Sequence, residues 1–159
     1  MSEANLRPLE PFDIPQVKEM WYRLVEAGET ADPRFKPAPD AKEAIDAYAR
    51  ETWVRRHPFS HGWVAVGDDR LVAFLLGVPT QPVPVLDRPQ ISVITDIWVD
   101  PDWRRLGLGR ELVERFASTS RAAGYPVVEV NTLSADSRAV AFWHSMGFTD
   151  WMVRLSRDR

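Results

Sequence analysis

The sequence predicts a single α/β domain over residues 1–159, with a mixed β-sheet and helices packed on it. Short apolar runs rich in β-branched residues are separated by segments in which apolar residues recur at helical spacing. Taken along the chain, these segments follow the order β-α-α-β-β-β-α-β-α-β. A chain of 159 residues with 45% apolar and 27% charged residues is long enough to bury a substantial core and has the composition of a soluble globular protein.

The first third of the chain predicts one strand and two helices. A short strand over residues 5–9 ends before Pro11. Asp13 caps a helix with apolar residues at 14, 17, 20, 21, 24 and 25, which Gly28 ends. Three prolines between residues 29 and 39 exclude a long regular element there. A second helix begins at about Asp40 and must end before Pro58.

The middle of the chain predicts strands. Runs over residues 63–66 and 71–78 flank a Gly-Asp-Asp-Arg turn at 67–70, which is typical of a β-hairpin. Residues 79–89 hold four prolines and are interpreted as a passive loop with no helix or strand of its own. Residues 91–99 form the next strand, and residues 106–123 form a helix that Gly124 terminates.

The last third predicts a strand over residues 127–133, apolar enough to be central in the sheet. Ser134 or Asp136 caps the next helix, which Gly147 ends. Residues 151–155 are interpreted as a final strand, followed by an arginine-rich tail that frays.

Residues 96–112 carry the clearest functional signal. An apolar strand is followed by a turn, by Gly107 and Gly109, and then by a helix. The first N–H groups of a helix lack intrahelical partners and lie at the positive end of its dipole, so they bind phosphate groups well. Glycines let the main chain approach such a ligand closely. Arg104, Arg105 and Arg110 add positive charge, so the segment predicts an anion site.

Two motifs resemble those of a known family. Val99-Asp100-Pro101 is followed by R-x-x-G-x-G at residues 104–109, and residues 134–148 read SADSRAVAFWHSMGF. Both resemble the GCN5-related N-acetyltransferase (GNAT) superfamily. The resemblance covers roughly residues 71–148, and the earlier part of the chain matches only in element order. It implies the acyl-CoA N-acyltransferase fold, with a central mixed sheet that splays between the fourth and fifth strands near Trp98 and Asn131.

The resemblance also implies the reaction and the residues of the site. The expected reaction is direct transfer of the acetyl group of acetyl-CoA to a primary amine in a ternary complex. The pantetheine arm is expected to pair with the main chain of the fourth strand, and the pyrophosphate with the following loop. The implied cosubstrate-binding residues are Ile97, Trp98, Val99, Arg104, Arg105, Leu106, Gly107, Leu108, Gly109, Arg110, Asn131, Asp136, Ala139, Phe142 and Trp143.

Asp96 is the candidate general base. A lysine-like ammonium has a pKa of ~10.4, so an acceptor for its proton is needed, and a carboxylate of ordinary pKa ~3.9 acts well only if burial raises that pKa or water relays the proton. The alternative is an aspartate at a strand edge that binds backbone or an arginine. Many relatives carry a tyrosine where this chain has Trp143, whose indole is too weak an acid, so no general acid is assigned.

The acceptor is less defined by the sequence. The first 52 residues hold eleven Asp or Glu and seven Lys or Arg, which favours a small cationic amine. Trp21, Tyr22, Trp53 and Trp63 could line its pocket together with Asp32 or Asp40, although core packing explains the tryptophans equally well. One alternative is acetylation of a protein N-terminus or lysine. The other is a catalytically silent acyl-CoA-binding regulatory module, which is consistent with Trp143 in place of the tyrosine. A dinucleotide fold is disfavoured because Leu112 replaces the third glycine of its motif.

Other classes of function are disfavoured by composition. A net charge of −3 argues against nucleic acid as a partner. The absence of cysteine excludes disulfides and thiolate metal sites, and Pro58 breaks the helix that would align His57 with His61, so no metal is expected. An acidic N-terminus and the lack of a long apolar run predict a cytoplasmic protein without a membrane partner. His144 is expected at the surface. A homodimer is possible, and the sequence does not decide between a monomer and a dimer.

Overall fold

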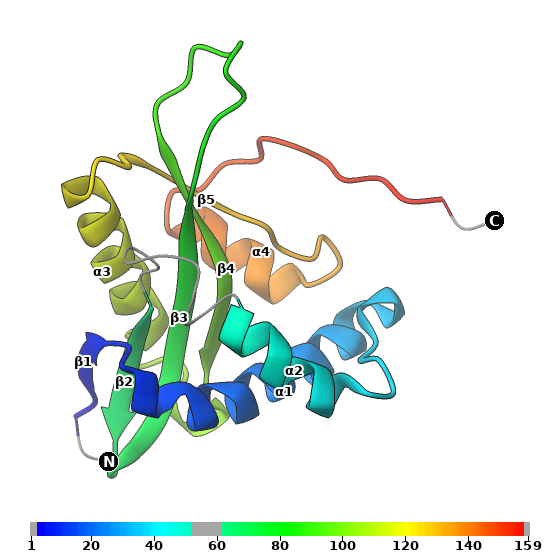
Figure 1. The fold of residues 1–159 in the computed structure, drawn as a ribbon, viewed down its shortest axis with the longest axis vertical. Coiled ribbons are helices and arrows are strands. Elements are labelled where there is room, and N and C mark those ends of the chain that lie inside the picture. The colour runs from blue at the N-terminus through cyan, green and yellow to red at the C-terminus, as the bar shows by residue number, and fades with distance from the viewer. Residues whose placement is uncertain (1–2, 52–61, 158–159) are drawn as a thin grey trace.

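The computed structural model describes residues 3–51 and 62–157, and it has one five-stranded mixed sheet with helices on both faces (Figure 1). The strands are β1 Asn5–Pro8, β2 Trp63–Gly67, β3 Arg70–Thr80, β4 Ile91–Val99 and β5 Val127–Val130. The helices are α1 Ile14–Ala31, α2 Ala41–Ala49, α3 Leu108–Ala122 and α4 Ser137–Ser145. The strand order is β1-β2-β3-β4-β5, antiparallel except for the parallel pair β4 and β5. The predicted fold class is therefore confirmed.

Two apolar clusters cover the two faces of the sheet. One joins α3 and Trp143 of α4 to one face, with Leu112 and Phe116 at its centre. The other joins α1 to the opposite face through Val17 and Met20, which pack on strand residues that include Phe74. Each helix is amphipathic, so its apolar stripe is buried on the sheet and its polar side faces water. No helix in the described part of the chain is long and apolar enough to cross a bilayer.

The hairpin between β2 and β3 forms where it was predicted. Asp68 and Asp69 have φ values of 51° and 59°, so both central residues of the turn are left-handed. This is the type I′ geometry that fits the twist of a two-residue hairpin, and aspartate tolerates it better than most residues.

Gly28 does not end the first helix, as the sequence had predicted. α1 continues to Ala31, and Gly28 lies where the short 3-10 segment Pro33–Phe35 packs back on the helix. A Cβ atom at Gly28 would lie 2.3 Å from Cδ1 of Phe35. The glycine therefore serves close packing of a ring on the helix. The proline-rich loop also starts later than predicted, because β3 includes Pro79 and runs to Thr80.

The two strand predictions nearest the C-terminus are wrong in part. β5 has four residues, Val127–Val130, where seven were expected, and it is an edge strand of the described sheet where a central one was expected. All four residues are half-buried. Residues 151–155 form no strand; the segment is extended and leaves the body of the molecule (Figure 1). Strand-forming composition therefore did not determine which neighbour, if any, each segment would pair with.

Candidate functional site

The fourth strand has an open edge at one end. β4 pairs with β5 only from Ile91↔Val127 to Ile94↔Val130, whereas its pairing with β3 continues to Val99. The last part of β4, residues 95–99, therefore has a strand on one side only among the described residues. Asn131 follows the last residue of β5, so the strands diverge near Trp98 and Asn131, as the sequence predicted. Open backbone edges of this kind can hydrogen-bond an extended ligand.

A β-bulge turns Asp96 toward α1. On β3 the partners Leu76 and Gly77 are adjacent, but they pair with Asp96 and Ile94, so Thr95 is an extra residue on β4. Because side chains alternate along a strand, the extra residue moves Asp96 to the face opposite Ile94. There the indole Nε1 of Trp21, 75 residues away in sequence, donates a hydrogen bond of 2.8 Å to Oδ1 of Asp96.

The surroundings of Asp96 favour a role as a base. Desolvation by burial raises the pKa of its carboxyl above the usual value. Hydrogen bonds from Thr95 and Trp21 act in the opposite direction and offset only part of that rise. A carboxylate with a raised pKa is a stronger base than an ordinary aspartate. The alternative interpretation was an aspartate at a strand edge that binds backbone or an arginine; among the described residues, the side chains that donate hydrogen bonds to Asp96 are those of Trp21 and Thr95.

The loop before α3 presents main-chain N–H groups. The first hydrogen bond of the helix runs from Glu111 N to Gly107 O at 3.0 Å, so the N–H groups of Leu108, Gly109 and Arg110 have no intrahelical acceptor. No side chain of the described residues caps them. Gly107 has φ = 85°, and a Cβ there would have no heavy atom within 4 Å, so the space beside the loop is open. Arg105 is also left-handed, with φ = 66°.

The three arginines of this loop have different roles. Nε of Arg104 donates to Val99 O at 2.8 Å, and its guanidinium lies over the Trp98 ring, 4.8 Å from the centroid. Arg104 is thereby held against the end of β4. Arg105 and Leu106 are exposed, and Nη2 of Arg110 lies 3.5 Å from Ser145 O on α4. Arg105 and Arg110 are thus the side chains with room to meet an anion beside the N–H groups.

Asp100 organises the turn that leads into this loop. Its side chain is almost fully buried and accepts hydrogen bonds from Trp98 Nε1 at 3.0 Å and from Arg70 Nη1 at 2.5 Å. Arg23 of α1 lies 3.5 Å from the same carboxylate. The sequence showed Asp100 only as part of the Val99-Asp100-Pro101 motif before the loop. The charge partners lie on a distant helix and a distant hairpin, and nothing local in the sequence points to them.

The start of α4 closes the other side of the gap. Asp136 caps this helix by accepting a hydrogen bond from Ala139 N at 3.0 Å, as one of the two predicted caps. A Cβ on Gly109 would lie 3.4 Å from Cζ of Phe142 and 3.9 Å from Cγ2 of Val99. The end of β4, the start of α3 and the side of α4 therefore meet at Gly109.

Trp143 lies in the core and not along the gap. Its side chain is 5% exposed and packs edge-to-face with Phe142 and Phe148, at centroid distances of 4.9 and 5.2 Å. The position at which many relatives carry a tyrosine is thus filled by an apolar contact, and the structure offers no acid there.

Comparison with known proteins agrees with this geometry. Residues 21–148 match the sequence model of the Acetyltransferase (GNAT) family. The chain belongs to this family. A GNAT relative from Salmonella typhimurium, the [Ribosomal protein bS18]-alanine N-acetyltransferase, is 33% identical over 87 residues, which are 55% of this chain and 53% of that protein. The match thus spans about half the length of this relative.

Solved structures share the GNAT fold over the whole chain. A tetramutant of the BH1408 protein from Bacillus halodurans superposes with a TM-score of 0.79 at 19% identity, covering 98% of this chain and 99% of the other. Aminoglycoside N-acetyltransferase AAC(6')-Iy in complex with CoA gives a TM-score of 0.72 at 15% identity, covering 100% and 97%. At such identities the likeness shows the fold alone.

Other residues that the sequence analysis considered for the site are held in contacts with other side chains or fall outside the described residues. Hydrogen bonds from Arg34 lower the pKa of Asp32 to about 2, so Asp32 forms a structural ion pair with Arg34. Asp40 precedes α2, and Lys42 lies 5.2 Å from the centre of the Tyr22 ring. His144 contacts Asp150 at the surface, 2.9 Å away, as expected. Trp53, His57 and His61 fall outside the described residues, and the described residues hold no cluster suited to a metal.

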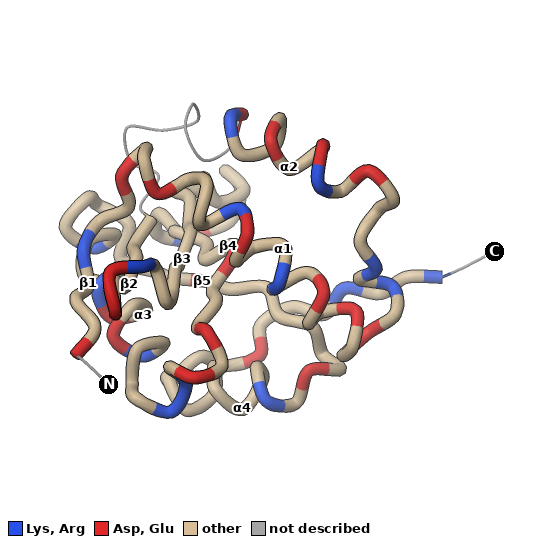
Figure 2. The backbone as a smooth tube through the Cα atoms, turned by 90° about the horizontal axis from the view of Figure 1, so that it is seen from below, with Lys and Arg blue, Asp and Glu red and all other residues tan. Residues whose placement is uncertain are grey.

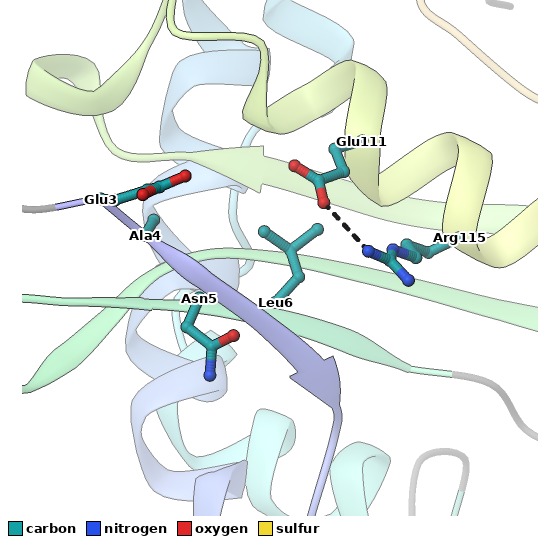
Figure 3. Close-up of a pocket in the computed structure, with 6 residues that line it drawn as sticks. All are labelled: Glu3, Ala4, Asn5, Leu6, Glu111 and Arg115. Carbon is teal, nitrogen blue, oxygen red and sulfur yellow. Dashed lines mark hydrogen bonds and ion pairs between the residues drawn. The ribbon is translucent and has the colours of Figure 1, made fainter.

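A separate cavity of about 350 Å³ lies at the far edge of the sheet, between β1 and α3 (Figure 3). It is lined by Glu3, Ala4, Asn5, Leu6, Glu111 and Arg115. None of the predicted site residues lines it, and β1 and β5 occupy opposite ends of the strand order. The cavity is therefore distinct from the gap beside β4.

Proposed function

We propose that this chain is an N-acetyltransferase that moves the acetyl group of acetyl-CoA to a primary amine of a small cationic molecule, by direct attack in a ternary complex. One observation carries the proposal: the open edge of β4 ends at a loop whose N–H groups at Leu108, Gly109 and Arg110 have no intrahelical acceptor. An extended amide-bearing arm fits the first feature and a diphosphate fits the second. The relatives' names, which include two N-acetyltransferases, support the same reaction.

The cosubstrate would be held by main chain more than by side chains. On either side of Trp98, whose backbone groups face β3, Ile97 and the N–H of Val99 offer backbone groups along the open edge, and residues 105–110 offer amides to the pyrophosphate, with Arg105 and Arg110 adding charge. Phe142 and Val99 border Gly109, so a ligand beside the loop meets apolar surface from β4 and α4. Asp136 and Ala139 act through the cap that fixes the start of α4, and Asn131 lies exposed where β5 ends.

Asp96 would remove the proton of the bound ammonium, directly or through a water molecule. The neutral amine then attacks the thioester carbonyl carbon, a C–N bond forms and the C–S bond breaks, and the second proton that the nitrogen loses to become an amide passes to solvent. A main-chain N–H on the open edge of β4 can stabilise the oxyanion that develops. Solvent can protonate the leaving thiolate, whose pKa is ~8.5, so the reaction does not require a tyrosine at position 143.

Aromatic and acidic groups near Asp96 favour a cationic acceptor. The Trp21 ring, which donates to Asp96, lies 5.9 Å from the ring of the partly exposed Tyr48. Aromatic faces and a carboxylate together attract an ammonium group. In Figure 2, acidic residues recur along α1 and α2, although basic residues are interleaved with them. AAC(6')-Iy, whose name marks it as acting on aminoglycosides, is consistent with an acceptor of this class.

A protein N-terminus is the second candidate acceptor. The relative from Salmonella typhimurium is named for the alanine of a ribosomal protein, and it is 33% identical over the 87 residues that match. The two candidates are separated by measuring thiol release with polyamines, aminoglycosides and an alanine-initiated peptide. Turnover with the polycations and not with the peptide supports the proposal, and the reverse result favours the second candidate. Tight CoA binding without turnover on any acceptor would instead indicate a silent binding module.

A substitution in the loop tests the cosubstrate site directly. Gly109→Asp is expected to weaken acetyl-CoA binding more than tenfold, about 1.4 kcal/mol, because it adds negative charge beside the amides. Gly109→Asn is the matched control, since it adds nearly the same volume without charge, and its loss should be clearly smaller. Isothermal titration measures both affinities. Equal affinities of the Asp variant and the natural chain would place the phosphates elsewhere.

A further inference from the structure

Asp100 is a buried carboxylate that connects three elements at the end of β4. The residue is 4% exposed. Its Oδ1 accepts a hydrogen bond from Nε1 of Trp98, and its Oδ2 accepts one from Nη1 of Arg70 at the start of β3. Nη1 of Arg23 on α1 lies 3.5 Å from Oδ1. A buried charge needs such partners to replace its lost hydration. The bond to Nε1 therefore fixes the orientation of the Trp98 ring.

The Trp98 ring in turn supports the side chain of Arg104. The guanidinium of Arg104 lies 4.8 Å from the ring centroid, and its Nε donates a hydrogen bond of 2.8 Å to the C=O of Val99. The face of a tryptophan ring attracts a cation, and a planar guanidinium can stack on the ring while it donates in its own plane. Arg104 therefore occupies a main-chain acceptor of β4.

The C=O of Val99 is one of the few main-chain groups that face the open edge. In an antiparallel pair, alternate residues direct both their N–H and their C=O to the same neighbour. The N–H of Asp100 donates to β3, so Trp98, two residues earlier, also faces β3. Ile97 and Val99 therefore face the open edge. Because the C=O of Val99 is already bound, the edge offers a ligand the N–H of Val99 and both groups of Ile97.

We propose that Asp100 and Arg104 are positioning residues for acetyl-CoA, and that Arg104 binds no phosphate. Asp100 holds the Trp98 ring, the ring holds Arg104, and Arg104 occupies the C=O of Val99. The pantetheine arm then has one register, in which a carbonyl oxygen of the arm accepts from the N–H of Val99. This inference rests on the proposed function, because it concerns how the same cosubstrate is held.

Replacing Arg104 by Met tests whether this residue positions the edge or binds phosphate. Met keeps an unbranched chain on the Trp98 ring but removes the Nε donor and the charge. Isothermal titration is expected to show acetyl-CoA binding about fivefold weaker, as for the loss of one hydrogen bond, both at low salt and at about 1 M salt. A loss that disappears at high salt would show that Arg104 acts through charge on a phosphate, and the proposal would be wrong.

Arg105→Met is the matched control for the salt dependence. It makes the same chemical change at the next position, where the arginine is exposed and is proposed to meet the phosphates through charge. Its loss of affinity should be present at low salt and should largely disappear at about 1 M salt, where the Debye length is about 3 Å. An equal salt response of the two variants would contradict the distinction between them.

The role of Asp100 is tested through Arg70, because replacing a buried charge destabilises the whole fold. The Arg70 side chain is 48% exposed and lies in the hairpin. Arg70→Met is expected to weaken acetyl-CoA binding about threefold with an unchanged number of sites, and Arg70→Lys, which keeps a cation beside Asp100, should restore most of the affinity. Loss of folded protein would instead lower the number of sites and leave the dissociation constant unchanged. An unchanged dissociation constant, with or without fewer sites, would overturn the role of Asp100.

The same titrations separate this inference from the proposed function. A natural chain that binds no acetyl-CoA would overturn both. Natural binding together with an unaltered affinity of the Arg104→Met variant would overturn the inference alone, and the cosubstrate site would stand without it.

Discussion

Asp96 acts in the proposed reaction only because of two neighbours in space. Thr95 supplies the bulge that turns the carboxylate toward α1, and Trp21 supplies the hydrogen bond that fixes one of its oxygens. The sequence identified Asp96 because it lies on the strand before the glycine-bearing loop. It did not identify the hydrogen bond from Trp21, since 75 residues separate the two. The bulge was not predicted from the sequence either; in the structure it shows in Ile94 and Ile97, which pack in the same cluster although they are three residues apart.

At this scale, replacing Trp21 by Phe is expected to shift the pH profile. The indole hydrogen bond stabilises the charged carboxylate and so lowers the pKa of Asp96; without it the pKa rises. Because the base works in its deprotonated form, the acidic limb of kcat/KM should move to higher pH, by about one unit for a bond worth about 1.5 kcal/mol.

Trp151→Phe makes the same chemical change far from Asp96 and is the control for the Trp21 variant. Its acidic limb should coincide with that of the natural chain. If Trp21→Phe lowers kcat/KM equally at every pH, the indole serves only to pack α1, and its effect on the Asp96 carboxyl is excluded.

At the scale of the element, the loop and helix around Gly107 were predicted nearly to the residue, because glycines and the turn before them are local signals. The helix begins at Leu108, two residues later than expected, since Gly107 takes the left-handed conformation before it. β5 and residues 151–155 were predicted less well. Their composition indicates strand, but edge position and pairing depend on neighbours that arise only when the chain folds.

The open elements predict a pattern of amide hydrogen exchange. Amides of residues 108–110 lack intrahelical acceptors and should exchange quickly in the free protein. Saturating acetyl-CoA is expected to slow exchange in residues 97–99 and 105–110 by about tenfold or more, because it binds to those groups. Peptides from α2 are the internal control and should not change. Protection confined to the cavity between β1 and α3 would contradict the proposed cosubstrate site.

At the scale of the whole molecule, the sequence predicted the mixed sheet and its element order because helical and strand periodicities alternate clearly. It could not predict which charges would be buried between elements. Asp13 is 2% exposed and binds Arg7 through both oxygens, at 2.7 and 2.8 Å, which ties the start of α1 to β1. Burial alone would raise the pKa of Asp13, but the bonds from Arg7 and from Glu10 N outweigh burial and lower the pKa.

Asp13 should therefore contribute to global stability in a pH-dependent manner. A carboxyl whose folded pKa is lowered stabilises the fold fully above its unfolded pKa of about 3.9, and the contribution is lost as the pH falls through the lower folded value. At neutral pH, Asp13→Asn is expected to reduce the free energy of unfolding by about 2 kcal/mol. Urea titrations at neutral and acidic pH measure the difference, which should shrink below pH ~4. Asp46→Asn, in an exposed pair with Lys18, is the control and should leave the midpoint unchanged.

The bulge at Thr95 shows that the partner on β3, and not the length of β4, sets the face on which the carboxylate lies. Asp96 is the cross-strand partner of Leu76, which packs on the α1 side, whereas Ile94 packs on the α3 side. Deleting the single codon for Thr95 would leave Ile94 and Asp96 adjacent in a regular strand with the same partners, so the carboxylate would stay on the α1 side. A homologous chain with a gap at this position could therefore keep its base, and the identity of the aligned acid is the informative feature.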